Sequence, residues 1–314
     1  MSVGVTAARG RRGSVVVALG ADVLLGEPPA RVHPTVAMGR WIAPLRARAK
    51  GAPSLEALAI GALGLAAGAA VTAGIAHAAE HLVRALPPAA RPCVRGLALK
   101  PALSLRALLA AGRAVERALA RGHLQRARQL LARHLVSRDT RTLAPSEVAG
   151  ATIESLAENL SDGLLAPLVY ERLGGLAGAY VYRFVNTADA MIGYRTPELE
   201  YLGKAAARAD DLLNLIPARL TALAICAAAR AGRGSFVGAL ACAVRDAHRT
   251  PSPNAGWPMA AMAGALGCRL TKRSGRALVY VLNPGGRPPR AADIARARRI
   301  VAAAATIGAG VIAA

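Results

Sequence analysis

The sequence predicts an all-α protein: a polytopic membrane helical bundle with amphipathic helices at its cytoplasmic face and interface. Two observations predict this class. Of the 314 residues, 54% are hydrophobic and 18% are charged, against about 45–50% and ~25% in soluble domains, so the composition is shifted toward lipid. Aromatic residues make up only 3%. Because sheets favour aromatic and β-branched side chains, this Ala-rich chain favours helices.

The first expected helix covers residues 14–25 and follows a basic segment at 9–12. This order imitates a secretory signal peptide. Asp22 interrupts the apolar run, however, and residues 26–29 read Gly-Glu-Pro-Pro in place of a small-residue cleavage site. We therefore expect a retained helix, embedded in the membrane or in the protein core.

Residues 57–76 form the clearest candidate span, because they carry no charge and are rich in Gly and Ala. At about 1.5 Å per residue this segment reaches ~30 Å, which is one hydrocarbon thickness. Small residues also suit close packing of helices in lipid. Its Leu and Phe content is low, so a buried core helix remains an alternative.

Three further segments complete the expected bundle of four or five spans. Residues 84–141 are basic and have apolar side chains at helical spacing, which is typical of a helix at the interface or in the cytoplasm. Residues 212–229 contain Pro217 and predict a kinked span or a helix that lines a cavity. Residues 300–314 form a short, charge-free tail behind a basic cluster, and residues 284–289 form a loop.

The formal net charge is +22, and a nucleic-acid partner is the first function to consider. Single-strand grooves interleave basic with aromatic side chains, and aromatic residues are scarce here. The arginines also flank apolar runs, as they do in cytoplasmic loops of membrane proteins. We expect no nucleic-acid partner. An anionic substrate such as a nucleotide, or an anionic lipid surface, suits the charge better.

The cysteines indicate neither a zinc site nor a disulfide framework. Cys93, Cys226, Cys242 and Cys268 include no C-x-x-C pair, and three of them lie in Ala-rich apolar stretches. We expect small buried side chains.

Three carboxylates recur at intervals of four residues, at Glu154, Glu158 and Asp162, and so share one face of a helix. Like charges at this spacing destabilise a helix, so a cationic group is expected nearby. The outer two are ~12 Å apart along the axis, too far for one ion to contact all three. Neighbouring pairs could share a Mg²⁺. A solvated acidic face is the alternative.

Two further segments combine arginine with amide and acidic side chains. Arg183, Asn186 and Thr187 share a helical face, and a charged fork beside neutral donors can hold phosphate; an arginine that caps a span is the alternative. Asp210 and Asp211 lie one turn before Asn214, which favours a second metal shell or an amine-binding site. Acids that complement the dipole at a helix start would give the same pattern.

No P-loop or dinucleotide-binding motif is present, so any ATP site is not a standard one. The order of polar motifs nevertheless resembles the CobD/CbiB family, the adenosylcobinamide-phosphate synthases of cobalamin biosynthesis. Six motifs carry the resemblance: D-x-L-L-G-E-P…H-P…M-G (22–39), S-R-D-T (137–140), E-S-L-A-E-N-L-S-D-G…A-P (154–167), Y-R-x-x-N-T-x-D-x-M-x-G-Y-R (182–195), A-R-x-D-D-x-x-N-x-x-P-A-R-L (207–220) and S-P-N-A-G-W-P (252–258).

The resemblance implies one membrane-embedded domain over residues 1–314, with a variable part at 51–133 and a motif-rich catalytic region at 137–258. It implies a multi-pass protein of the cell membrane whose motif-bearing face is cytoplasmic. The implied activity is an acid–amine ligase reaction. ATP and Mg²⁺ would serve to join (R)-1-aminopropan-2-ol, or its O-phosphate, to a propionate carboxylate of adenosylcobyric acid through an acyl phosphate. The expected partners are this corrinoid, the amine, ATP and membrane lipid, with a homo-oligomer left open.

The same resemblance gives the candidate residues their roles. Glu154, Glu158 and Asp162 would hold Mg²⁺ or the amine. Glu158, Asp162, Asp210 and Asp211 are the expected catalytic carboxylates. Phosphate groups would be held by Arg183, Asn186, Arg195, Arg208, Asn214 and Arg219. We expect these side chains and the carboxylates, which come from three separate segments, to converge on one pocket.

Two other functions remain open at this point. A membrane transferase acting on diphosphates, such as a prenyltransferase, also places acidic helix faces around Mg²⁺, but it forms product without consuming ATP. A permease or scaffold would use its intramembrane polar residues as a pathway and would show no turnover.

Overall fold

The computed structural model describes residues 2–274 and 277–314, and it is mainly helical. Its internal contacts divide the chain into two compact units. The first contains Met1–Ser104, Ala166–Asn214 and Ile312–Ala314, and the second contains Leu105–Leu165 and Leu215–Val311. The expected all-α class is confirmed. The single-domain organisation stays a prediction.

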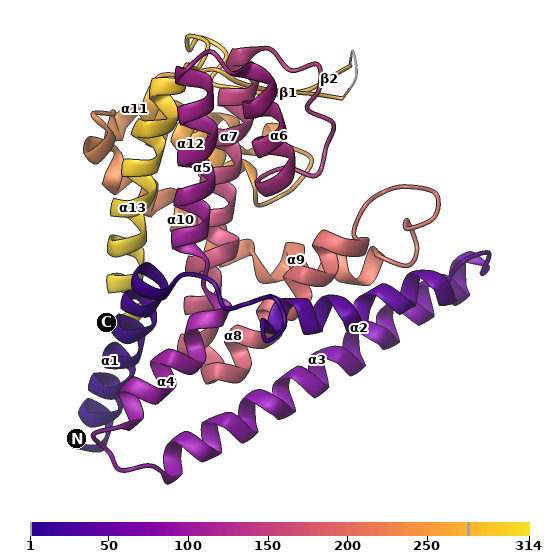
Figure 1. The fold of residues 1–314 in the computed structure, drawn as a ribbon, viewed down its shortest axis with the longest axis vertical. Helices are drawn as coiled ribbons and strands as arrows, with labels where there is room; N and C mark the ends of the chain where they lie inside the picture. Colours follow the sequence, from indigo (N-terminus) through magenta and orange to yellow (C-terminus); the bar gives the residue numbers. More distant parts are fainter. Residues whose placement is uncertain (1, 275–276) are drawn as a thin grey trace. The chain divides into compact units, whose positions relative to one another are not determined.

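The first unit is built around a long helix, α3, against which α2 and α8 pack (Figure 1). Its buried core includes Ile42 of α2 and Phe184 and Ile192 of α8. His33 caps the start of α2, and Pro34 occupies the first helical position. Proline suits this position because a backbone N–H there would have no partner inside the helix. The elements of this unit are α1 (Ser2–Leu25), α2 (Pro34–Arg48), α3 (Ser54–Ala85), α4 (Arg91–Leu99), η1 (Lys100–Ala102), α8 (Ala166–Ile192) and α9 (Lys204–Leu213).

The second unit is a helical cluster in which α12 is buried almost throughout. α11 and α10 both pack against this central helix. The elements of this unit are α5 (Leu105–Ala120), α6 (Leu124–His134), α7 (Pro145–Leu160), the π-helical turn η2 (Ser161–Leu165), α10 (Leu215–Ala228), η3 (Ala229–Gly232), α11 (Phe236–Asp246), η4 (Ala247–Arg249), α12 (Gly256–Leu266), β1 (Leu270–Ser274), β2 (Ala277–Leu282) and α13 (Ala291–Ala313), which ends among residues assigned to the first unit.

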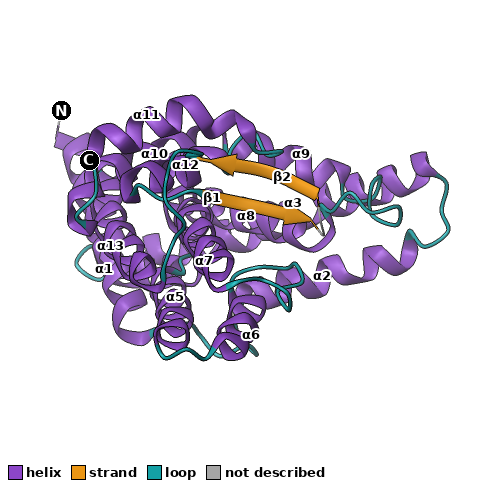
Figure 2. Cartoon of the chain, turned by 90° about the horizontal axis from the view of Figure 1, so that it is seen from above, coloured by secondary structure: helices purple, strands orange, loops and turns teal. Residues whose placement is uncertain are grey.

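An antiparallel hairpin, which the sequence analysis did not predict, pairs β1 with β2 in the second unit (Figure 2). Its register joins Leu270 to Leu282 and Lys272 to Tyr280. The β-branched and aromatic run of β2 is the sequence signal for this strand. The loop expected at 284–289 follows it and is confirmed.

Among the described residues, two helices are long and apolar enough to cross a membrane, Ser54–Ala85 and Leu215–Gly232. In the most apolar 18-residue stretch of each helix, 11% of the residues are buried in the first and 56% in the second. The helical state expected for residues 14–25 and 300–314 is confirmed, but neither α1 nor α13 passes this test. Much of α13 is buried instead, including Ile300 and Val301.

The kink expected at Pro217 is wrong. The helix breaks at Asn214, between α9 and α10, and Pro217 lies in the first turn of α10. A proline in a first turn costs no hydrogen bond, because backbone N–H groups there have no partner inside the helix. The cysteine prediction holds for Cys226, Cys242 and Cys268, which are free and buried, whereas Cys93 is exposed.

Glycines allow α3 to pack closely inside the first unit. A Cβ added at Gly61 would overlap the carbonyl oxygen of Leu202, and one at Gly68 would overlap the ring of Phe184. Gly74, on the same helix, has no atom within 4 Å of such a Cβ. The close helix packing that the small residues predicted is therefore present at Gly61 and Gly68.

We predict that Gly61→Ala destabilises the protein by about 1–3 kcal/mol, because backbone must move to admit the methyl group. Gly74→Ala is the matched control and should be neutral or stabilising by up to ~1 kcal/mol, because alanine is the better helix former. Thermal unfolding in one detergent compares the two variants. Equal midpoints for the two would contradict the close packing.

Candidate functional site

A chain of hydrogen bonds connects α8 and α9 through one carboxylate. Asp210 accepts from the side-chain amides of Asn186, at 3.2 Å, and Asn214, at 3.0 Å. The hydroxyl of Tyr182 donates to the Asn214 Oδ1 at 2.9 Å. Arg183 donates from Nη1 to the Asn186 Oδ1 at 3.3 Å. The structure therefore brings four of the predicted residues into one network.

Two tyrosines fix the position of this network. Tyr182 is 1% exposed, and its ring stacks on that of Tyr170 with a centroid distance of 5.3 Å. The Tyr170 hydroxyl donates to the carbonyl oxygen of Leu213 at 2.7 Å, at the end of α9. This end of α9 is thereby tied to α8, and the amides that face Asp210 are held in place.

The electrostatic surroundings of Asp210 leave its charge under-compensated. Burial raises the pKa of its carboxyl group, and the hydrogen bonds from Asn186 and Asn214 oppose that rise without cancelling it. Asp210 and Asp211 lie in the last turn of α9, where a carboxylate opposes the helix dipole. The alternative of acids complementing a helix start is therefore wrong for α9.

A small basic pocket of about 180 Å³ lies at the other side of this helix. Its lining includes Arg195, Arg208, Asp211 and Lys204. Burial raises the pKa of the Asp211 carboxyl group, and the charges of Arg208 and Arg195 act in the opposite direction. Glu200 also lines the pocket, so three cations face two carboxylates. The small positive excess that remains suits an anionic ligand.

The acidic helix α7 lies in the second unit, and Glu154 on it is only 5% exposed. Arg138 places its Nη2 3.8 Å from the Glu154 Oε2, which is the cationic neighbour that the charge spacing predicted. Glu154 Oε1 is buried and accepts no hydrogen bond from the described residues. Glu158 and Asp162 are half-buried, so the alternative of a fully solvated acidic face is wrong.

Burial raises the pKa of Glu154 to about 7, although Arg138 and Lys272 lower it, and Glu158 adds to the rise. The hydroxyl of the buried Tyr280, which donates to the Met259 Sδ at 3.8 Å, also lowers the pKa of this carboxyl group. Asp162 falls in the π-helical turn that follows α7. Such turns occur often at functional sites, and this one shifts Asp162 out of the regular α-helical spacing.

The acidic face does not form a metal cage made by protein alone. Within residues 2–274 and 277–314, no three His, Cys, Asp or Glu side chains lie close enough together to hold one metal ion. This agrees with the expectation that one ion cannot contact all three carboxylates of α7. The donor set, with its unsatisfied Glu154 oxygen, fits a Mg²⁺ held by one or two carboxylates together with substrate phosphates and water.

Arg219 belongs to the second unit, where two of the six motifs meet. It donates to the Asn254 Oδ1 at 3.2 Å and to the Leu215 carbonyl oxygen at 2.7 Å. Its guanidinium carbon lies 4.9 Å from the centre of the Trp257 ring. The arginine is thus held by the S-P-N-A-G-W-P motif. Its convergence with the arginines of the first unit stays a prediction.

The motif nearest the N-terminus forms an ion-pair chain in the first unit. Lys100 lies 3.3 Å from the Glu27 carboxylate and 3.7 Å from that of Asp22, which is fully buried. His33 lies 3.0 Å from the same Glu27 oxygen. The His33 side chain also caps the start of α2, where it accepts from the backbone N–H of Thr35.

Several residues of these clusters were absent from the predicted set: Tyr182, Lys204, Arg138, Lys272 and Tyr280. Tyr182 is the first residue of the motif at 182–195 and directly precedes Arg183, so the sequence could have indicated it as a site residue. Lys204 follows a glycine and begins α9. Lys272 and Tyr280 approach Glu154 through the hairpin, which the sequence analysis left unassigned.

The fold and these clusters define a helical protein with polar sites, rich in arginine and carboxylate, on otherwise apolar helices. Residues 15–301 match a family model described as CobD/Cbib protein. The chain therefore belongs to the CobD/CbiB family, and the resemblance carried by the six motifs is confirmed.

Individual relatives agree with this assignment. A cobalamin biosynthesis protein CobD of Rhodobacter capsulatus is 41% identical over 298 residues, which cover 90% of each chain. A protein of the same name from Geobacter metallireducens is 39% identical over 274 residues, covering 87% of this chain and 84% of the relative. A probable cobalamin biosynthesis protein CobD of Methanothermobacter thermautotrophicus is 38% identical over 266 residues, 83% of each. No solved structure matches.

We predict that Glu154 makes stability fall as pH rises. Its folded-state pKa of about 7 exceeds the ordinary 4.5, so the folded protein binds the extra proton, and the difference is worth about 3 kcal/mol, lost between pH 4.5 and 7. Glu154→Gln should flatten that part of the profile of unfolding free energy against pH. The exposed Glu56→Gln is the control. A profile unchanged by Glu154→Gln would show that the pKa of Glu154 does not differ between the folded and the unfolded protein.

Proposed function

We propose that this protein is an acid–amine ligase of cobalamin biosynthesis. It attaches (R)-1-aminopropan-2-ol, or its O-phosphate, to a propionate carboxylate of adenosylcobyric acid and gives adenosylcobinamide or its phosphate. Membership of the CobD/CbiB family supports the pathway. The observation that carries the reaction class is the basic pocket at Arg195 and Arg208 beside under-compensated carboxylates on one short helix.

The chemistry requires activation of a carboxylate, which is a poor electrophile. In the proposed reaction, a propionate oxygen of the corrinoid attacks the γ-phosphorus of ATP and ADP leaves, giving an acyl phosphate. The amine nitrogen then attacks the acyl carbon, the C–N bond forms, and inorganic phosphate leaves with the C–O bond electrons. Guanidinium groups stabilise the charge that develops on the transferring phosphoryl group.

We assign the cationic side chains to the phosphate groups and the aspartates to the amine. Arg195 and Arg208 bind phosphate oxygens in the pocket at α9, with Lys204 adding a third cation, and Arg183 and Arg219 serve the same class of ligand. Asn186 and Asn214 orient these groups through their contacts with Asp210. Asp210 or Asp211 takes the proton that the amine must lose before it attacks. The raised carboxyl pKa values at these positions make both groups stronger bases than an ordinary aspartate.

Glu154, Glu158 and Asp162 are proposed to bind Mg²⁺ or the ammonium form of the amine. When bound, Mg²⁺ neutralises charge on the phosphate oxygens of ATP. Arg138 and Lys272 keep a fraction of the Glu154 charge in place against burial, while the half-buried Glu158 and Asp162 remain accessible to ligand.

The same proposal places the protein in the cell membrane with several spans and with the motif-bearing face in the cytoplasm. The two candidate spanning helices support membrane association. A cytoplasmic face is required by the reaction, because ATP is available on that side.

Purified protein incubated with adenosylcobyric acid, ATP, Mg²⁺ and either amine tests the reaction class. Mass spectrometry should detect an amide product, with one ATP consumed for each product formed. Product without ATP consumption would favour a transferase that acts on diphosphates. Transport into vesicles without turnover would favour a permease.

We predict that Glu158→Gln lowers the rate of ATP-dependent amide formation by at least about a hundredfold, the scale of losing a metal-binding or acid–base carboxylate. The isosteric change should leave the unfolding midpoint within a few degrees of that of the wild type. The exposed Glu56→Gln, treated identically, should retain full activity. Wild-type turnover in Glu158→Gln removes this residue from the site.

We predict that Arg208→Gln raises the KM for aminopropanol phosphate by roughly tenfold or more, since a hydrogen bond from a charged group is worth about 1.5–3 kcal/mol. The KM for unphosphorylated aminopropanol should change little. The exposed Arg121→Gln is the control for a general loss of positive charge. An equal rise for both amines would mean that Arg208 does not contact the amine's phosphate.

A further inference from the structure

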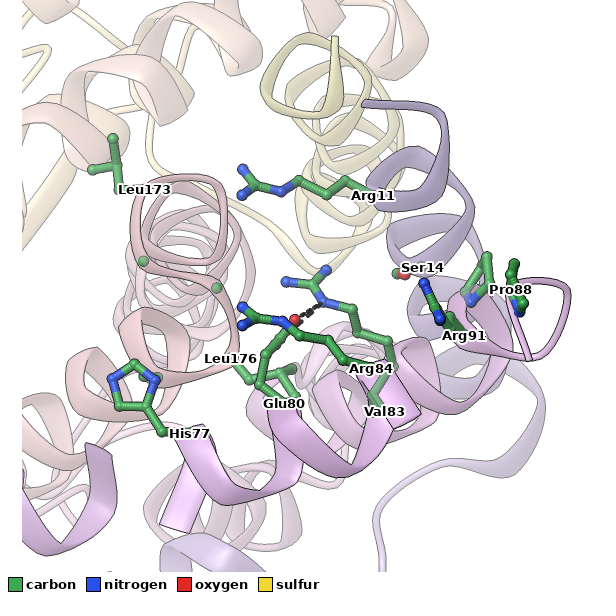
Figure 3. Close-up of a pocket in the computed structure, with 15 residues that line it drawn as sticks. Arg11, Ser14, His77, Glu80, Val83, Arg84, Pro88, Arg91, Leu173 and Leu176 are labelled. Carbon is green, nitrogen blue, oxygen red and sulfur yellow. Dashed lines mark hydrogen bonds and ion pairs between the residues drawn. The ribbon is translucent and has the colours of Figure 1, made fainter. Parts of the chain in front are cut away.

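A second basic pocket lies in the first unit, away from the α8–α9 network. Its volume is about 740 Å³, and it is lined by α1, the end of α3, α4 and the glycine pair of α8. Figure 3 shows Arg11, Arg84 and Arg91 arranged around it from three different helices. None of these arginines was predicted to belong to a site, and the proposed ligase reaction does not use them.

The charges around this pocket do not balance. Arg95, which is buried, pairs with Glu80 at 3.0 Å and with Glu171. Within the described part of the chain, Arg11 and Arg91 donate only to backbone carbonyl oxygens, those of Arg172 and Leu86.

Among the described residues, Arg84 has no hydrogen bond or ion pair at all. Three guanidinium groups thus line one cavity without a carboxylate of their own. Like charges held this close repel, and a bound anion would relieve that repulsion. Arginine forks match the geometry of phosphate oxygens in particular.

The glycine pair of α8 also lines this pocket. Gly174 and Gly175 leave helical geometry, and Gly175 has a φ of +65°, which favours glycine. Leu173, directly before this break, is 73% exposed and lines the pocket. Around this break the pocket is lined by backbone, by the apolar Leu173 and by the ion pair of Glu80 with Arg95.

An apolar groove of about 440 Å³ adjoins the basic pocket along α3. Leu176 lines both. On α3, Ala76 and Ala79 line the groove, whereas His77 and Glu80 line the pocket. The pocket and the groove thus lie next to each other along α3. The far walls of the groove carry larger apolar side chains, among them Trp41 and Phe184.

The basic pocket and the apolar groove both lie along α3, which is the more exposed of the two candidate spanning helices. Ile75 is 68% exposed and Leu82 is 72% exposed, so its apolar surface is available to lipid. The basic pocket lies at its C-terminal end, where arginine follows the apolar run. Lipid headgroups lie at such boundaries, and basic pockets between membrane helices bind anionic headgroups.

We propose that this composite cavity is a binding site for an anionic membrane phospholipid. Arg11, Arg84 and Arg91 bind the phosphate of the headgroup, and one acyl chain lies in the groove past Ala79 toward Trp41. A phosphate free in solution would satisfy only the arginines. The continuity of the basic pocket with an apolar groove selects a ligand that has both parts. This inference is independent of the ligase reaction.

Native mass spectrometry of the full-length protein, stripped of lipid in detergent, tests the site. Phosphatidylglycerol should bind at least about tenfold more tightly than phosphatidylcholine. Arg84→Gln should weaken phosphatidylglycerol binding about tenfold. It should leave the fold intact, since Arg84 has no hydrogen bond or ion pair with any residue that the structure describes. Arg126→Gln, which removes an exposed arginine from the second unit, is the matched control and should bind as the wild type does.

The groove has its own pair of variants. Ala79→Trp fills the groove and should weaken phosphatidylglycerol binding, whereas Ala78→Trp, one residue away and exposed, should not. Thermal unfolding of each variant reports whether it is folded.

Inorganic phosphate and glycerol 3-phosphate distinguish the two sources of a phosphate ligand. Neither should displace the lipid at millimolar concentration. Equal binding of the two lipids, or no difference between Arg84→Gln and Arg126→Gln, overturns the proposal. Displacement by glycerol 3-phosphate together with full binding by Ala79→Trp overturns it in favour of a soluble anion.

Discussion

The carboxylate of Asp210 is the interaction on which the polar architecture of the first unit depends. It accepts hydrogen bonds from an amide on α8 and an amide at the end of α9, while a tyrosine pair on α8 holds that end in place. A buried charge without such donors would cost several kcal/mol. The network therefore fixes where α9 lies against α8, and α9 in turn carries Arg208 and Asp211 to their pocket. Packing and site geometry share one cause here.

Small residues supply the complementary constraint. A chain with so few aromatic residues cannot fill a core with large rings, so its helices must approach closely. α3 does this at Gly61 and Gly68, where backbone and ring atoms occupy the space that a side chain would need. Close approach brings polar groups of neighbouring helices within reach of each other. In this way a composition that signals apolar helices also permits the buried ion pairs of Arg95 and the Asp210 network.

The sequence predicted what depends on local periodicity. The helical state of the candidate span and the shared face of Arg183 and Asn186 follow from residue spacing, and both are present. Three outcomes depended on tertiary contacts and were not predictable in the same way. Tyr182 enters the site through its contact with Asn214, distant in sequence. The hairpin brings Lys272 to Glu154 across more than a hundred residues, and nothing near Glu154 encodes that approach. The break at Asn214 reflects where the polar network forms, which the nearby proline obscured.

Two kinds of buried carboxylate can be told apart in this protein. Burial acts to raise the pKa of Asp246 and Asp293, yet hydrogen bonds from arginines and backbone N–H groups outweigh it and hold both pKa values at about 2. These two acids are saturated with donors and fasten loops. Glu154 is also buried and Asp210 is half-buried, but here the loss of solvent contact prevails and the pKa values of both carboxyl groups rise. Arginine is abundant in this chain, yet arginines do not offset the effect of burial at the carboxylates of Glu154 and Asp210 as they do at Asp246 and Asp293. Under-compensated acids are typical of sites that complete their electrostatics with a ligand, so the contrast within one protein favours Glu154 and Asp210 as binding groups over structural ones.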